Sequence, residues 1–157
     1  MEKHEEFMRQ AILLSKENVE KQTGGPFGAV IVKDGEVIAK SANLVTKNND
    51  PTAHAEVSAI RLACEKLQTF TLEGCVIYTS CEPCPMCLGA IYWARLAKMY
   101  YANTKADAAN IGFDDAFIYK ELDLKMEERQ LKSEQLLNHE ALEAFKMWEI
   151  SMGKTEY

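Results

Sequence analysis

Two short motifs offer one histidine and two cysteines to a single metal ion, and no other feature constrains the fold as strongly. His54, Ala55 and Glu56 form the first motif, and Cys84 and Cys87 belong to a Pro-Cys-Pro-Met-Cys motif that begins 27 residues after the glutamate. One imidazole and two thiolates are ordinary zinc ligands, and three protein ligands leave one tetrahedral position open for water. The chain must therefore fold so that two separate segments meet at one open site.

Both motifs are predicted to start helices. Apolar residues recur every three or four positions across residues 53–67, which predicts a buried helix with His54 and Glu56 at its N-terminal end. Prolines on both sides of Cys84 are tolerated in a first helical turn, so a second helix is expected over residues 86–95. The positive end of a helix lowers the pKa of a thiol and favours the thiolate that a metal binds.

The remaining elements are strands mixed with helices. A helix is expected over residues 2–20, strands over 27–32, 37–39, 75–79 and 98–102, a loop over 43–51, and a long helix within 133–152. Strands that alternate with helices indicate a layered α/β domain with a partly parallel sheet. We expect residues 1–157 to form one domain with a helical tail over about 133–157.

Composition limits the classes of partner. Acidic residues outnumber basic ones by 24 to 18, and the net charge of −6 argues against a polynucleotide substrate. No run approaches the roughly 20 apolar residues that span a bilayer, and the polar N-terminus does not read as a signal peptide. Five cysteines in such a chain favour metal binding or free thiols over disulfides. We therefore expect a cytoplasmic protein.

A structural zinc is the strongest alternative to a catalytic one. Cys81 could complete a closed Cys3His site with Cys84, Cys87 and His54, because the three cysteines follow a C-x-x-C-x-x-C pattern. This interpretation gives no purpose to Glu56, whereas a glutamate beside an open zinc site can take a proton from water and pass it on.

Several polar and aromatic residues have two interpretations. Asn43 is either a turn residue or an amide that reads a nucleobase edge, since its side chain both donates and accepts hydrogen bonds. Phe27 is either a core anchor or a stacking wall. Asp114 and Asp115 lie in an acidic Gly-Phe-Asp-Asp turn that is solvated in most proteins.

With these motifs in view, the sequence resembles the cytidine-deaminase-like superfamily and, within it, the bacterial guanine deaminases. H-x-E followed by P-C-x-x-C is the known signature of zinc deaminases. The similar segments are 24–35 (GGPFGAVIVKDG), 49–56 (NDPTAHAE), 78–95 (YTSCEPCPMCLGAIYWAR), 107–109 (DAA), 112–115 (GFDD) and 154–157 (KTEY). Residues 127–142, rich in Glu, Lys and Gln, depart from the family pattern.

The resemblance implies a three-layer α/β/α fold with a five-stranded mixed sheet. It further implies a homodimer in which the C-terminal segment is exchanged between subunits, and one zinc ion per chain. For the base, it implies that Asn43 and the backbone at Ala55 hold it and that Phe27 and Phe113 flank it. Asp115 and Tyr157 would read its far edge.

The implied reaction is the zinc-dependent hydrolysis of guanine to xanthine and ammonia, a step of guanine catabolism. Glu56 would be the catalytic acid and base, with Asp115 assisting departure of the amine. Three rivals are another small-molecule deaminase acting on guanosine, cytosine or a triazine analogue, a tRNA adenosine deaminase, and the non-catalytic zinc module that uses Cys81.

Overall fold

In the computed structural model, which describes residues 2–157, the sheet is built around strand β3 (Val76–Cys81). The strand order is β2 (Glu36–Ala42), β1 (Gly28–Lys33), β3 and β4 (Lys98–Asn103). β1 runs antiparallel to β2 and β3, whereas β4 runs parallel to β3. A parallel pair needs a crossover, and helix α4 (Pro85–Trp93) makes it. The sheet is therefore mixed, as expected.

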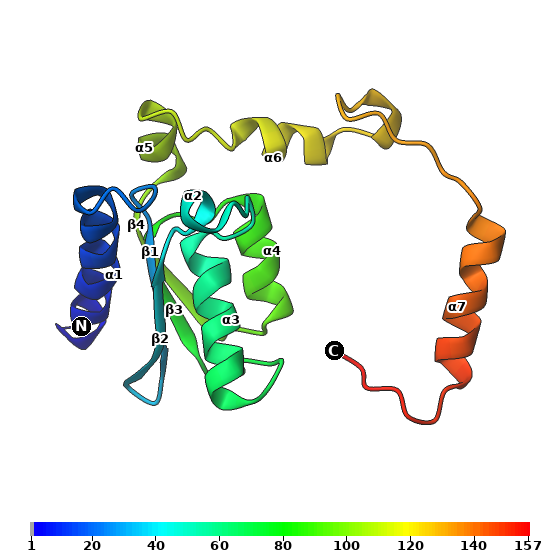
Figure 1. The fold of residues 1–157 in the computed structure, drawn as a ribbon, viewed down its shortest axis with the longest axis horizontal. Coiled ribbons are helices and arrows are strands. Elements are labelled where there is room, and N and C mark those ends of the chain that lie inside the picture. The colour runs from blue at the N-terminus through cyan, green and yellow to red at the C-terminus, as the bar shows by residue number, and fades with distance from the viewer. Residues whose placement is uncertain (1) are drawn as a thin grey trace. The chain divides into compact units, whose positions relative to one another are not determined.

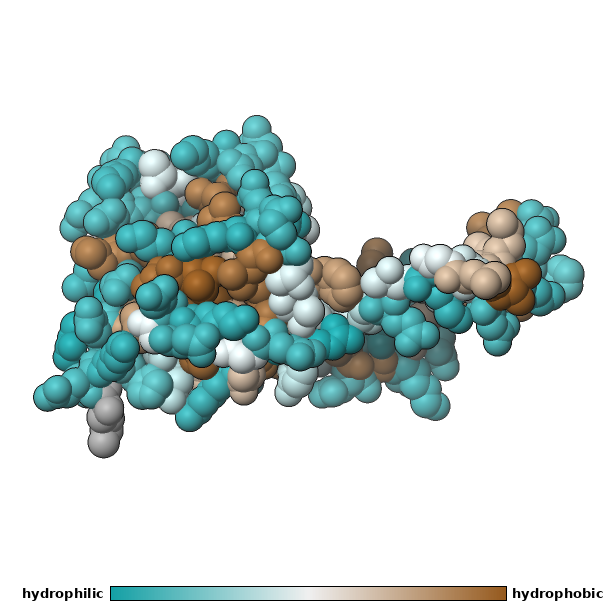
Figure 2. Space-filling view, turned by 90° about the horizontal axis from the view of Figure 1, so that it is seen from below, coloured by the Kyte–Doolittle hydropathy of each residue, from teal (hydrophilic) through white to brown (hydrophobic). Residues whose placement is uncertain are grey.

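Helices cover both faces of this sheet (Figure 1). Helix α1 (Glu2–Glu20) packs on one face, and α3 (Ala55–Leu67) packs on the other, beside α4. Figure 2 shows the consequence from one side, where apolar side chains form a band between polar layers. The α/β/α layering predicted from the sequence is present.

Strand β1 serves both layers because successive side chains of a strand point to opposite faces. Val30 and Val32 belong to the cluster that packs against α1, and Ala29 and Ile31 belong to the cluster that packs against α3. All four are buried, and burying a Val or Ile side chain contributes about 1.5–3 kcal/mol. Because both faces of β1 are buried, residues 27–32 form a continuous apolar run.

The five strands implied by the family resemblance are not found, because the described residues form a sheet of four. After β4 the chain turns at once into helix α5 (Lys105–Asn110). Thr104 Oγ1 accepts a hydrogen bond from Asp107 N at 3.2 Å, and the Asp107 carboxylate accepts one from Thr104 N at 2.8 Å. This capping box starts α5 directly after β4. β4 is the edge strand of the sheet, and its side chains are largely exposed.

Residues from Ala116 onward form a second unit of the chain. It contains α6 (Ala116–Asp123), a short 3-10 helix (Met126–Glu128) and α7 (Asn138–Ile150), which is the tail helix expected within residues 133–152. No residue of this unit is buried, and the apolar side chains of α7 are exposed. The tail therefore has no core of its own.

Most expected elements occur within one or two residues of their predicted ends. The loop expected over 43–51 instead contains a one-turn helix, α2 (Val45–Asn48), which ends at Asn49 in the left-handed conformation. Helices α2, α5 and α6 and the 3-10 helix were not predicted, since elements of three to eight residues are too short to show a clear periodic pattern. In the part of the chain that the structure describes, no helix has the length and apolar character needed to cross a membrane.

Candidate metal centre and active site

The two helix starts meet and bring three ligand atoms together. His54 is the N-cap residue of α3 and Cys84 the N-cap residue of α4. His54 Nδ1 lies 3.5 Å from Cys84 Sγ and 3.4 Å from Cys87 Sγ, and all three ligand atoms lie within 4.8 Å of one another. A tetrahedral zinc ion holds a nitrogen and a sulfur ligand about 3.6 Å apart. The donor set and its spacing therefore fit zinc.

The thiols are prepared for metal binding. The neighbouring Cys87, together with His54, lowers the pKa of Cys84 to about 4. The proximity of Cys84, together with burial and the charge of Glu56, raises the pKa of Cys87. Both sulfurs lie at the N-terminal turn of α4, where the helix dipole favours negative charge. One thiolate is thus present at neutral pH, and a thiolate is the form that a metal binds.

Cys81 does not join this group. Its Sγ donates to the backbone oxygen of Thr104 at 3.6 Å, and burial raises its pKa to about 11. The ligand group among the described residues comprises His54, Cys84 and Cys87 without it. Cys81 is therefore held as a protonated thiol, and the closed Cys3His alternative loses its fourth ligand.

Glu56 lies against the ligands. It is the second residue of α3 and only 5% exposed. Its Oε2 accepts a hydrogen bond from Cys87 Sγ at 3.4 Å, and its Oε1 accepts one from Thr79 Oγ1 at 3.1 Å. Burial raises the pKa of this carboxyl above its usual value. A carboxyl group held beside an open metal site is the arrangement that metal-assisted hydrolysis uses.

Thr79 was missed by the sequence analysis, which treated residues 75–79 only as a core strand. Its hydroxyl also lies 2.8 Å from the backbone oxygen of Cys81, so one proton serves two acceptors. The two-residue alternation of β3 puts Thr79 on the same face as Ile77, which packs in the α3 cluster. That alternation was the available signal, because a buried hydroxyl on this face needs a partner.

Asn43 follows β2 directly and is 7% exposed. Its Oδ1 accepts a hydrogen bond from Val45 N at 3.2 Å, a local contact that turn residues commonly make. Its backbone N donates to Phe27 O at 3.0 Å, so these two residues are directly linked. Ala55, the first residue of α3, is fully buried beside His54.

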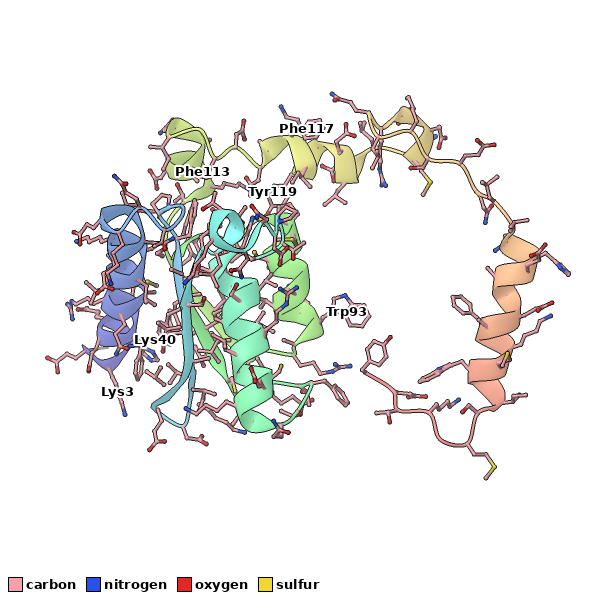
Figure 3. The ribbon with its side chains drawn as sticks, in the orientation of Figure 1. Lys3, Lys40, Trp93, Phe113, Phe117 and Tyr119 are labelled. Carbon is pink, nitrogen blue, oxygen red and sulfur yellow. The ribbon has the colours of Figure 1, made fainter. Side chains whose placement is uncertain are left out.

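Phe27 and Phe113 lie in contact, with ring centroids 4.9 Å apart and planes at 88°. Phe27 also packs on the α3 core cluster, so the interpretation as a core anchor holds alongside the aromatic contact. Phe113 is 47% exposed and follows α5, near the end of the sheet where β1 begins (Figure 3). The pair thus joins the end of the α5 turn to the start of β1.

The two aspartates of the acidic turn differ. Asp114 is exposed, whereas Asp115 is half-buried. Burial raises the pKa of Asp115, and the negative charge of Cys84 raises it further. Asp115 is thus the more buried of the two aspartates. Tyr157 belongs to the second unit and is 71% exposed there.

Comparisons with known proteins agree with this geometry. The family model for the cytidine and deoxycytidylate deaminase zinc-binding region matches residues 1–103. The chain belongs to this deaminase family. The zinc ligands are therefore His54, Cys84 and Cys87, on the donor set and spacing found above.

Within the family, similarity to one group spans the whole chain. The chain is 55% identical to guanine deaminase from Bacillus subtilis over 98% of its length and 99% of that protein. The crystal structure of a B. subtilis guanine deaminase superposes with a TM-score of 0.95 over 98% of both chains. A tRNA-specific adenosine deaminase from Aquifex aeolicus is 45% identical over 62% of this chain and 64% of that protein.

The ligand assignment leads to a prediction about metal content. His54→Ala, Cys84→Ala and Cys87→Ala each remove one of three ligands, so each purified variant should retain little zinc. Cys81→Ser should keep one zinc per chain, because Cys81 bonds to Thr104 and not to the ligand group. Elemental analysis of dialysed protein measures the ratio. Loss of zinc in Cys81→Ser with retention in Cys84→Ala would contradict the assignment.

Proposed function

We propose that the chain is a zinc-dependent guanine deaminase that hydrolyses guanine to xanthine and ammonia. The observation that carries the proposal is the 55% identity to a guanine deaminase over 98% of the chain. The His54, Cys84 and Cys87 centre with Glu56 beside it supplies the chemistry that hydrolytic deamination requires.

When bound, zinc lowers the pKa of a coordinated water and so supplies a nucleophile at neutral pH. Glu56 would accept a proton from the attacking water and donate it to ring N3 as the oxygen adds to C2. Glu56 would then take the proton of the added hydroxyl and pass it to the exocyclic amine. The C2=O bond would form as the C2–N bond breaks, and the amine would leave as ammonia. Asp115 assists this departure. One water is consumed, and xanthine and ammonia are formed.

Recognition of the base is assigned to the residues around this centre. We infer that the Asn43 amide and the backbone at Ala55 hold the purine, and that Phe27 and Phe113 flank it. The direct hydrogen bond between Asn43 and Phe27 supports a common site. The negative charge of Cys84 contributes to the raised pKa of Asp115, which supports placing Asp115 at the far edge of guanine. A carboxylate there can accept hydrogen bonds from the N–H groups of the base.

A substrate screen tests the proposed function. Ammonia release by purified protein should be fast with guanine and much slower with adenine, cytosine, guanosine or a triazine. Adenine presents a different donor pattern, and leaving a buried polar group unpaired costs roughly 1–3 kcal/mol, or about a 5- to 150-fold loss. Initial rates from a coupled ammonia assay give the comparison.

Transfer RNA belongs in the same screen, because a tRNA-specific adenosine deaminase is also similar over part of the chain. The net charge of −6 disfavours binding to phosphates, so tRNA turnover should be negligible. Deamination of tRNA without deamination of guanine would overturn the proposed function.

The general acid–base role predicts a specific variant. Glu56→Ala removes the proton carrier but none of the metal ligands, so zinc content and fold should be retained. Its kcat on guanine should fall by about 10²–10⁴-fold or more, the usual scale for such a group. Steady-state kinetics, zinc analysis and circular dichroism on the same sample make the test, and full activity would refute the mechanism.

We also propose that residues 1–157 act as one deaminase domain in a homodimer that exchanges its C-terminal tail. Two exposed apolar surfaces support this. Tyr92 and Trp93 of α4 are 75% and 66% exposed, and Trp93 projects outward from the helix (Figure 3). In α7, Phe145 and Ile150 are 74% and 81% exposed. Large exposed apolar side chains of this kind are typical of an interface, and a second copy would supply both sets at once.

The tail prediction concerns the last four residues. If Tyr157 closes over the purine and excludes water, removing residues 154–157 should cut kcat/KM on guanine at least tenfold, about 1.4 kcal/mol. Zinc content and melting temperature should hardly change, because these residues are outside the core. Unchanged turnover of guanine would show that the tail has no part in the active site.

Mixing the truncated chain with the Glu56→Ala chain tests whether the tail is exchanged between subunits. Truncated chains keep Glu56, and full-length Glu56→Ala chains keep the tail. After unfolding and refolding together with zinc, mixed dimers would unite an intact tail with an intact Glu56, so activity should exceed the sum of the separate samples. No gain in a mixture that forms dimers by light scattering would exclude the exchange.

A further inference from the structure

Asn18 is a buried polar residue that the metal centre does not use. It lies near the C-terminal end of α1, is 5% exposed, and is the one polar residue among the three that α1 buries. Helix α1 packs on one face of the sheet. Helix α3, which begins at the metal ligand His54, packs on the opposite face. An amide at this depth needs hydrogen-bond partners, and those partners connect it to the proposed purine-binding residues.

Both protons of the Asn18 amide are donated to backbone oxygens of other segments. Nδ2 lies 2.8 Å from Gly25 O and 2.9 Å from Asn43 O. The acceptor Oδ1 is used as well, since Thr23 Oγ1 donates to it at 2.6 Å. The side chain therefore has one orientation, and that orientation joins the loop before β1 to the residue after β2.

These contacts close a ring of hydrogen bonds. Phe27 N donates to Gly25 O at 2.8 Å, and Asn43 N donates to Phe27 O at 3.0 Å. With the two Asn18 bonds, the ring runs from Asn18 to Gly25, Phe27 and Asn43 and returns to Asn18. The aromatic wall and the amide proposed to hold the purine are both members of it.

The ring is packed tightly at Gly24. A Cβ atom there would lie 2.5 Å from Asn43 O and 2.8 Å from Asn18 Nδ2, closer than such contacts allow. The loop thus approaches the Asn18 amide closely, and a glycine makes that approach possible. The geometry leaves little freedom for Phe27 to move relative to Asn43 while Asn18 is in place.

We propose that Asn18 is a positioning residue that sets the placement of Phe27 relative to Asn43 and thereby the affinity for the purine. The inference rests on the proposed function, because only there do Phe27 and Asn43 act on one ligand. Displacing binding groups by about 1 Å can cost on the order of 100-fold in rate, so a distant amide can matter.

The test is the steady-state kinetics of Asn18→Ala on guanine. The variant removes both donors, so KM should rise about tenfold while kcat changes less than about threefold, the pattern of lost binding common to ground and transition states. Zinc content should stay at the wild-type ratio. A purely structural role predicts the opposite split, since partial unfolding lowers apparent kcat and leaves KM unchanged.

A matched control separates positioning from loosening of α1. Phe7→Leu changes another buried residue of the same helix, which packs on Tyr78 and has no bond to the ring. It should lower the melting temperature but leave KM on guanine unchanged. Equal KM values in Asn18→Ala, Phe7→Leu and wild type would overturn the proposal, and so would an equal rise of KM in both variants.

A milder variant covers the case in which Asn18→Ala does not fold. Thr23→Val keeps the shape of a half-buried residue and removes only the hydroxyl that orients Asn18. KM should rise about threefold, and an unchanged KM would count against the proposal. Wild type that releases no ammonia from guanine refutes the proposed function itself, whereas active wild type with unaltered variants refutes only the role of Asn18.

A double variant tests whether Asn18 acts through Asn43. In an Asn43→Ala background, adding Asn18→Ala should raise KM by clearly less than it does in wild type, because contacting residues are not additive. Additive effects would show that Asn18 influences binding by another route and would overturn the proposed linkage.

Discussion

The meeting of two helix N-termini at one point is the constraint on which the rest of the structure depends. His54 caps α3 and Cys84 caps α4, and their ligand atoms lie 3.5 Å apart although 30 residues separate them. The parallel pairing of β3 with β4 requires α4 as a crossover, and α3 packs on the same face of the sheet. The layered fold is therefore the frame that holds three ligands at the spacing of one zinc ion.

Each polar side chain around this centre has a hydrogen-bond partner that fixes its position. Cys87 and Thr79 hold the two oxygens of Glu56, and Thr104 holds Cys81 away from the ligand group. Because buried polar groups without partners are costly, these bonds restrict each side chain to one position. Cys81, the candidate fourth ligand, bonds to Thr104 instead, and an open fourth position is what separates a catalytic zinc from a structural one.

The two units differ in how they are stabilised. The unit up to Asp115 buries both faces of its sheet, while no residue from Ala116 onward is fully buried. Exposed aromatic and aliphatic residues on α4 and α7 are the reason to expect a second copy of the chain. Chain ends are ordered mainly where they dock, which is the basis of the proposal that the tail closes over the substrate.

The sequence by itself determined the metal ligands, Glu56 and most elements up to β4. Donor chemistry, helix periodicity and proline or glycine breaks are local properties, so they can be read without the fold. Tertiary structure decided what depends on the packing of distant segments. It placed Thr79 beside Glu56 and Cys81 beside Thr104, and it enclosed Asn18 in a ring of hydrogen bonds.

The number of strands is another property that the sequence did not determine. Family resemblance implied five strands, whereas the described residues form a sheet of four, with helices after β4. Asn18 is the clearest case. The sequence predicted its helix over residues 2–20, but no local pattern tells whether a buried amide covers the core or bonds to two loops. Only the approach of α1 to the residues after β2 decided between them, because hydrogen-bond partners across 25 residues are set by packing.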